Sequence, residues 1–144
     1  MVEKKYPKRY TAGLSKEDKK KQKKQLDKST SDYKKGKLTE RKKLESYKPK
    51  KSSYVEEVKD KIGLPINVDK LADKFSRTDK RKKELKKGME EIIDKGKGAY
   101  YSSGSRPNQT PDSWGKGRLA SVLVGGPSRK IDKKIVDKYN IPKI

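Results

Sequence analysis

One stretch of this 144-residue chain is nearly free of charge, and it limits where a folded core can form. Residues 98–126 carry only four charged side chains, whereas 43% of all residues in the chain are charged. The same stretch holds Tyr100, Tyr101, Trp114 and the apolar segment LASVL. An unpaired lysine buried among such residues would lose the hydration of its charge. The pattern therefore predicts that this stretch folds inward or docks on a partner.

The rest of the chain has too few apolar residues for a large core. Hydrophobic residues make up 28% of the sequence, whereas folded domains usually contain about 45 to 50%. A net charge of +22 combined with this low hydrophobicity is typical of chains that stay disordered until a partner binds. We therefore expect one small domain and a basic arm, and we expect residues 1–50 to be disordered in the free protein.

The charge locates that arm at the N-terminus. Residues 1–50 hold 19 lysines or arginines against 7 acidic residues, and residues 51–97 hold 14 against 10. Apolar residues recur at helical spacing only from Tyr54 onward. The sequence thus predicts an all-α protein with two parts: a basic, extended or helical arm rich in Lys and Tyr (1–52), and a small helical domain (53–144).

Helix starts and stops are marked along the chain. In the arm, Ser15 with Asp18 predicts the start of a polar helix that runs to about Lys35, before Gly36. Capping patterns then predict four further elements: a helix after Ser53 that ends at Gly63, one capped by Asn67, one opened by Ser76 and ending near Gly96, and one capped by Asp112 or Ser113 that ends at Gly125. A last short helix is expected to carry Ile131, Ile135 and Tyr139.

The usual catalytic residues are missing. The chain has no cysteine and no histidine, which removes thiolate nucleophiles, cysteine-bound zinc and the commonest general base. An enzyme could use only the serines, arginine and aspartate of this low-charge stretch, which are Ser102, Ser103, Ser105, Arg106 and Asp112. Because no base stands near these serines and Asp112 fits a helix cap, we expect no enzyme, cofactor, metal or small-molecule substrate. No membrane span is expected either.

Two sets of residues are candidates for partner contacts. Tyrosines spaced among lysines, together with the low-charge stretch 98–126, provide docking candidates: Tyr6, Tyr10, Tyr33, Tyr47, Arg106 and Trp114. We expect Arg106 to bond carbonyl or acidic groups near its loop and Trp114 to lie in the core. Lysine pairs provide candidate phosphate contacts: Lys19, Lys20, Lys23, Lys24, Lys42 and Lys43. A flexible, solvated tail with tyrosines at chance positions is the simpler alternative.

The low-charge stretch 98–126 also resembles part of a known family. YYSSGSRPNQTPDSWGKGRLAS, followed by GG and by Ile131 and Asp132, is similar to the C-terminal signature of a family of small lysine-rich proteins in large nucleocytoplasmic DNA viruses, relatives of algal and amoebal giant viruses. The similarity extends upstream to YTAGLSKEDKKKQKK and TERKKLESYKPKKSSYVEE. The resemblance implies a viral origin and a place in or near the particle, assembled in the infected host cell. It implies no activity.

Three function classes therefore remain. The first is a virion structural protein, a minor capsid or cement subunit whose basic arm lies along capsid proteins. The second is a DNA-binding or DNA-condensing protein packaged in the virion. The third, an enzyme built on the serine loop, is the least favoured. We rank the capsid protein first because a DNA condenser needs no aromatic anchors, whereas a chain ordered along a protein surface does.

Overall fold

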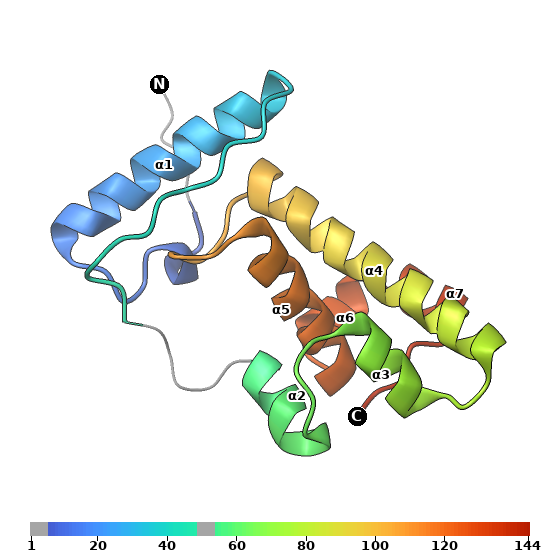
Figure 1. Ribbon diagram of the computed structural model, residues 1–144. Helices are drawn as coiled ribbons and strands as arrows, with labels where there is room; N and C mark the ends of the chain where they lie inside the picture. Colours follow the sequence, from blue (N-terminus) through green and yellow to red (C-terminus); the bar gives the residue numbers. More distant parts are fainter. Residues whose placement is uncertain (1–5, 49–53) are drawn as a thin grey trace. The chain divides into compact units, whose positions relative to one another are not determined.

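The computed structural model describes residues 6–48 and 54–144, and the described residues form helices and no strand (Figure 1). The all-α prediction is confirmed. The elements are the 3-10 helix η1 (Lys8–Tyr10) and the α-helices α1 (Lys16–Lys34), α2 (Tyr54–Ile62), α3 (Val68–Phe75), α4 (Asp79–Ser102), α5 (Pro111–Val124), α6 (Pro127–Ile131) and α7 (Lys133–Tyr139).

The chain divides into two compact units. Unit 1 comprises residues 1–50 and 97–114, and unit 2 comprises residues 51–96 and 115–144. The sequence-based division into 1–52 and 53–144 places the segment 97–114 with the C-terminal region. In the structure this segment belongs to the same unit as the N-terminal arm, so the arm has a partner within its own chain.

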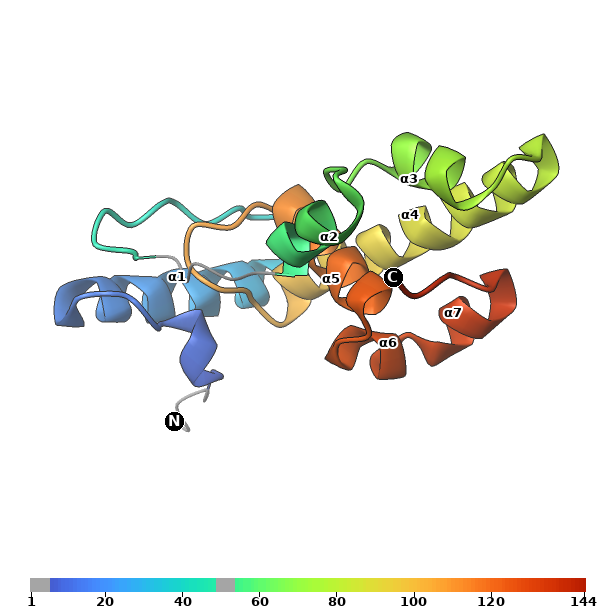
Figure 2. The same cartoon turned by 90° about the horizontal axis from the view of Figure 1, so that it is seen from below.

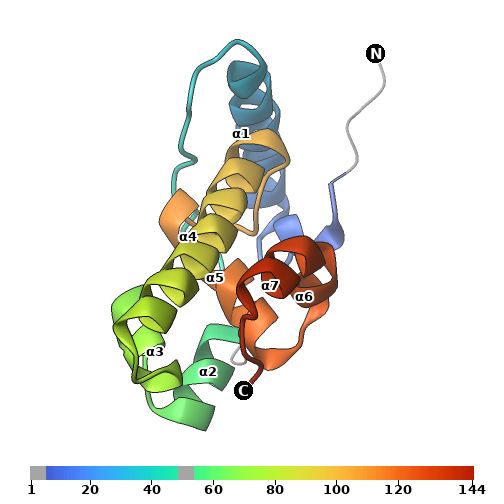
Figure 3. The same ribbon diagram turned by 90° about the vertical axis from the view of Figure 1, so that its right-hand side faces the viewer.

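Unit 2 holds an apolar core. In Figure 3, α3 lies beside the N-terminal half of α4, and the short helices α6 and α7 lie next to each other. Leu85, Met89, Ile92 and Ile93 of α4 are buried, as are Leu119 to Leu123 of α5. The remaining buried residues of this core are Val58, Ile66, Leu71, Ala72, Ile135, Val136 and Ile141.

Two of the predicted helix caps are confirmed and two are wrong. Ser15 and Asn67 accept the expected backbone bonds, the latter from Lys70 N at 3.0 Å. Helix α4 begins at Asp79, where Thr78 rather than Ser76 faces the first turn and accepts a bond from Arg81 N. The capping hydroxyl of α5 is that of Thr110, which accepts from Ser113 N at 3.0 Å. Ser53 lies outside the described residues.

Helix α4 does not end at Gly96 as predicted. It continues to Ser102, and the chain reverses at Gly104, which has a φ of +108° and donates its N–H to Ala99 O at 3.0 Å. A glycine within a helix costs about 1 kcal/mol relative to alanine. The extra turns bury Tyr100 completely, and a buried aromatic side chain stabilises by more than that cost.

The predicted last helix is two helices. Asp132 ends α6 and precedes α7, and it is 1% exposed. Its carboxylate accepts two bonds from Arg118, from Nε and from Nη2, each at 2.7 Å. Ile131, expected on the apolar face of a single helix, is 68% exposed. The chain therefore breaks where the buried ion pair requires the carboxylate.

Candidate functional site

Helix α1 has a polar inner face. It runs from Lys16 to Lys34 as predicted, and Gly36 follows with a φ of +84°. Its buried residues include a single apolar side chain, Leu26, and are otherwise polar: Asp18, Gln22, Ser29 and Thr30. A helix that is polar all round needs a polar partner. That partner is the segment 37–48 of the same chain, which runs beside α1 in two views (Figures 1 and 2).

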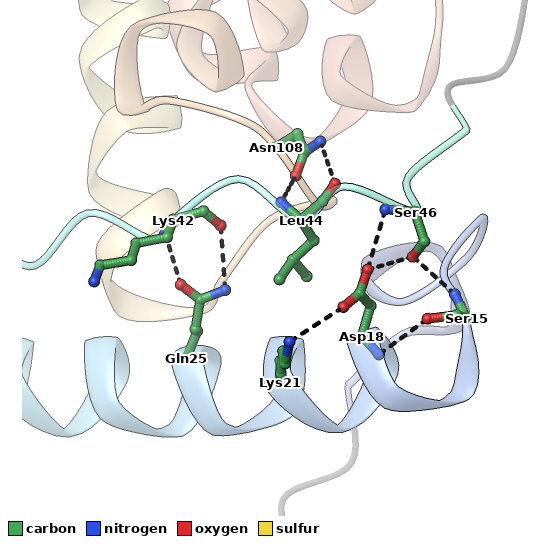
Figure 4. Close-up of polar contacts among 8 residues, drawn as sticks. All are labelled: Ser15, Asp18, Lys21, Gln25, Lys42, Leu44, Ser46 and Asn108. Carbon is green, nitrogen blue, oxygen red and sulfur yellow. Dashed lines mark hydrogen bonds and ion pairs between the residues drawn. The ribbon is translucent and has the colours of Figure 1, made fainter.

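The segment 37–48 is bound by side-chain amides (Figure 4). Lys42 N donates to Gln25 Oε1 at 2.6 Å, and Gln25 Nε2 donates to Lys42 O at 3.2 Å. Asn108 repeats the arrangement on Leu44, accepting from its N–H at 2.7 Å and donating to its carbonyl at 3.0 Å. Each carboxamide therefore satisfies both backbone groups of one residue, as a neighbouring strand would do.

One end of the segment is fixed to the start of α1. The Asp18 carboxylate accepts from both the N–H and the hydroxyl of Ser46. Ser15 N donates to Ser46 Oγ at 3.0 Å, and Ser15 Oγ accepts from Asp18 N at 3.2 Å. The Ser46 hydroxyl, followed by its N–H, lowers the pKa of Asp18 because both bonds favour the ionised carboxylate.

Arg41 joins both pieces of unit 1. Its guanidinium donates to Ser29 Oγ at 2.6 Å, to Tyr100 O at 3.0 Å and to Ser105 Oγ at 2.8 Å. It also lies 3.7 Å from the centre of the Tyr100 ring, and Arg41 N donates to the Tyr100 hydroxyl at 2.7 Å. Burial lowers the pKa of Arg41, but an arginine stays charged in a protein. The only sequence signal for this role is one arginine among lysines, and this signal does not predict the contacts of Arg41.

Arg106, which the sequence had suggested for such bonds, does not make them. It is half-buried, and its guanidinium forms no hydrogen bond with another described residue. The nearby Ser105 hydroxyl accepts from Arg41 and donates to the carbonyl of Arg106. The prediction of loop contacts by Arg106 is therefore wrong, and its docking role stays a prediction.

Two of the predicted docking tyrosines are used inside unit 1. Tyr10 is 6% exposed and meets Trp114 edge-on, with ring centres 6.1 Å apart. The Tyr6 hydroxyl donates to Asp27 at 2.6 Å, and burial, together with this bond, raises the pKa of Tyr6 to about 12. Tyr33 is 41% exposed, whereas Tyr47 and Trp114 are half-buried, so the prediction that Trp114 lies in a core holds only in part.

The predicted phosphate contacts all lie at the surface. Lys19, Lys20, Lys23, Lys24, Lys42 and Lys43 are exposed. On α1, a spacing of three to four residues brings lysines onto one face, which we call the lysine stripe: Lys16, Lys20, Lys23, Lys24 and Lys28. Glu17 and Asp27 share that face, and Asp27 holds the Tyr6 hydroxyl. No member of the stripe forms an ion pair with another described residue.

The serines of the low-charge stretch lie in different surroundings. Ser102 and Ser103 are exposed, and the Ser105 hydroxyl is held by Arg41. No three acidic side chains gather there as metal ligands would. Within residues 6–48 and 54–144, no helix is both long and apolar enough to cross a membrane.

Comparison with known proteins places the chain in a family. A family model described as "Family of unknown function (DUF5824)" matches residues 7–138, so the chain belongs to that family. Neither the curated proteins nor the solved structures provide a match. The match covers both units and includes α1, the segment 37–48 and the loop that carries Asn108.

Proposed function

We propose that this member of the DUF5824 family is a nucleic-acid-binding structural protein that contacts phosphates through the lysine stripe of α1. The observation that carries the proposal is a helix face of five exposed lysines without ion-pair partners among the described residues. Lysines neutralise phosphates and release counterions, which supplies most of the free energy of sequence-independent binding. From Lys16 to Lys28, twelve residues further along, the helix rises about 18 Å, which brings several phosphates of one duplex within reach.

The geometry favours this function over protein docking because of where the tyrosines lie. Docking along a capsid surface depends on aromatic anchors in the arm. Tyr10 is buried against Trp114, and Tyr6 is bonded to Asp27. Both side chains therefore stabilise unit 1, and the lysines are the larger part of what α1 presents to a partner.

The test compares two triple variants with equal changes in charge. In the first, Lys20, Lys23 and Lys24 of the stripe become glutamine. In the control, the exposed Lys70, Lys74 and Lys83 of unit 2 become glutamine. Affinity for a DNA duplex is measured by fluorescence anisotropy over a range of salt concentrations, because each lost phosphate contact lowers the slope of log K against log salt by about 1.

The stripe variant is expected to lower that slope by about 2 to 3, and the control variant to leave it nearly unchanged. Equal losses in both variants would mean that net charge alone attracts DNA, and the proposed site on α1 would be withdrawn.

The second candidate is the virion structural protein, a minor capsid or cement subunit, and one observation favours it. Tyr33 and Leu38 lie near the C-terminal end of α1 and are 41% and 63% exposed. The resemblance to proteins of large DNA viruses supports capsid proteins as the partner and the virion as the location. Replacing Tyr33 and Leu38 by serine, while keeping Tyr10 intact, is expected to release the protein from purified empty shells. Retention with the genome after shell disruption would favour the DNA-binding function.

A further inference from the structure

We infer that unit 1 binds a phosphate group in a small basic pocket formed by Arg9, Lys48 and Arg106. This inference rests on the proposed nucleic-acid binding and adds a defined phosphate site to it. The pocket has a volume of about 170 Å³. Its lining residues come from three separate stretches of unit 1: Arg9, Ala12, Gly13, Tyr47, Lys48 and Arg106.

Among the described residues, the lining has three cationic side chains and no carboxylate. Like charges around one cavity repel each other, so an anion bound among them would be favoured over a cation or a neutral ligand. The planar guanidinium group of arginine matches the geometry of a phosphate and donates two parallel hydrogen bonds to its oxygens. The pocket chemistry therefore selects an anion with several oxygens.

The use of arginine elsewhere in the chain singles out this pocket. Of the 42 basic residues, seven are arginine. Four of them bond backbone or side-chain oxygens within the fold: Arg41, Arg81, Arg118 and Arg129. Of the three that make no such side-chain bond among the described residues, Arg9 and Arg106 line the same pocket, and the third, Arg77, is exposed on unit 2.

The wall between Arg9 and Lys48 is fixed by a close backbone approach. Lys48 N donates to Gly13 O at 3.0 Å. Gly13 has a φ of +79°, and a Cβ there would lie 2.6 Å from Lys48 O. Only glycine fits this approach without strain. Arg9 also lies 5.1 Å from the centre of the buried Tyr10 ring, which anchors its side of the pocket.

The volume decides which part of a ligand enters. One water molecule accounts for about 30 Å³ of liquid, so the pocket has room for a phosphate group and a few waters. Pockets that enclose whole drug-sized ligands measure roughly 300 to 1,000 Å³. The site therefore fits the phosphate of a larger molecule or free phosphate, with the remainder of a nucleotide outside.

The first experiment titrates the full chain, labelled with ¹⁵N, with inorganic phosphate, against sodium chloride of matched ionic strength. We expect the side-chain Nε–H signal of Arg106 and the amide of Gly13 to shift with phosphate and not with chloride. Arg106→Gln should abolish the Gly13 shift, whereas Arg77→Gln, with the same loss of charge, should keep it. An unchanged Trp114 emission spectrum checks that the Arg106 variant is folded.

The second experiment separates the sources of the phosphate. A short single-stranded oligonucleotide is added with or without a 5′-phosphate. If the Nε–H signal of Arg106 shifts with both forms, the site takes backbone phosphates. If it shifts only with the 5′-phosphorylated form, the site takes a terminal phosphate. Both results support the inference. No response of Arg106 to any phosphate, or equal effects of the Arg106 and Arg77 variants, overturns it.

These results also separate this inference from the proposed function. If the stripe variant loses DNA affinity while Arg106 ignores phosphate, the pocket inference fails and the proposed function stands. If Arg106 responds to inorganic phosphate while the stripe and control variants bind DNA equally, the proposed function fails and the pocket stands.

Discussion

The two units of this protein are stabilised by different kinds of interaction. Among the described residues, unit 2 buries an apolar cluster drawn from five helices, α2 to α5 and α7. Unit 1 buries only a few apolar side chains and fixes its extended segment through side-chain bonds to backbone groups, from Gln25, Asn108 and Arg41. A typical hydrogen bond contributes about 0.5 to 1.5 kcal/mol net, whereas a buried leucine or isoleucine contributes about 1.5 to 3. A lysine-rich sequence can thus fold on polar contacts, but we expect unit 1 to be the less stable unit.

The largest effect is expected in unit 2, from Arg118→Met. Asp132 would remain buried without its partner, and breaking a buried ion pair costs about 3 to 5 kcal/mol. Unfolding by denaturant, followed by circular dichroism and by the amide signals of α5, measures the loss. The double variant Arg118→Met with Asp132→Leu should recover most of it. If the free energy of unfolding of the single variant is within 0.5 kcal/mol of the parent's, as for an ordinary surface substitution, the Arg118–Asp132 pair does not stabilise unit 2 as expected.

A smaller loss is expected in unit 1 from Tyr100→Phe. The hydroxyl that accepts from Arg41 N would be missing, and an unpaired amide in a partly buried place costs about 1 to 3 kcal/mol. Trp114 fluorescence reports on this unit during denaturation. Tyr101→Phe is the matched control, because the Tyr101 hydroxyl forms no hydrogen bond with a described residue. Equal effects of the two substitutions would show that the Tyr100–Arg41 bond is not important for unit 1.

Gln22→Leu is expected to stabilise unit 1. Gln22 is 1% exposed, and its Nε2 has no hydrogen-bond partner among the described residues. Replacing an unsatisfied buried amide by an apolar side chain of similar size should gain about 1 kcal/mol. The matched substitution Gln25→Leu should destabilise, because Gln25 holds both backbone groups of Lys42. If both substitutions destabilise alike, the polar character of the α1 face matters as a whole.

The smallest effect concerns pH and Asp18. Because the pKa of Asp18 is lowered in the folded chain, its contribution to stability is present above the pKa of the unfolded state, near 4, and is lost as the pH falls through the folded value. Asp18→Asn should therefore weaken unit 1 at pH 7 and match the parent at low pH. Asp60→Asn in unit 2 is the control. A difference that grows toward low pH would reverse the assigned sign.

The predictable features of the fold are the local ones. Ser15, Asn67 and Gly36 mark helix ends through residues within four positions, so α1 and α3 could be read from the sequence. The continuation of α4 through Gly96 could not, because it depends on the burial of Tyr100. The role of Arg41 depends on partners up to 64 positions away. No local pattern distinguishes such an arginine from its lysine neighbours. The pairing of Leu44 with Asn108 could not be predicted either, because these residues are 64 positions apart in the sequence.

The pairing of the segment 37–48 with residues far along the chain also sets the order of events during synthesis. Arg41 needs Tyr100, 59 residues later, and Leu44 needs Asn108, 64 residues later. At a synthesis rate of about 5 to 20 residues per second, that delay lasts roughly 3 to 13 s. Throughout this interval the lysine-rich segments have been synthesised without the residues that close unit 1. The lysine-rich segments of a growing chain therefore carry their positive charge for several seconds before unit 1 can close around them.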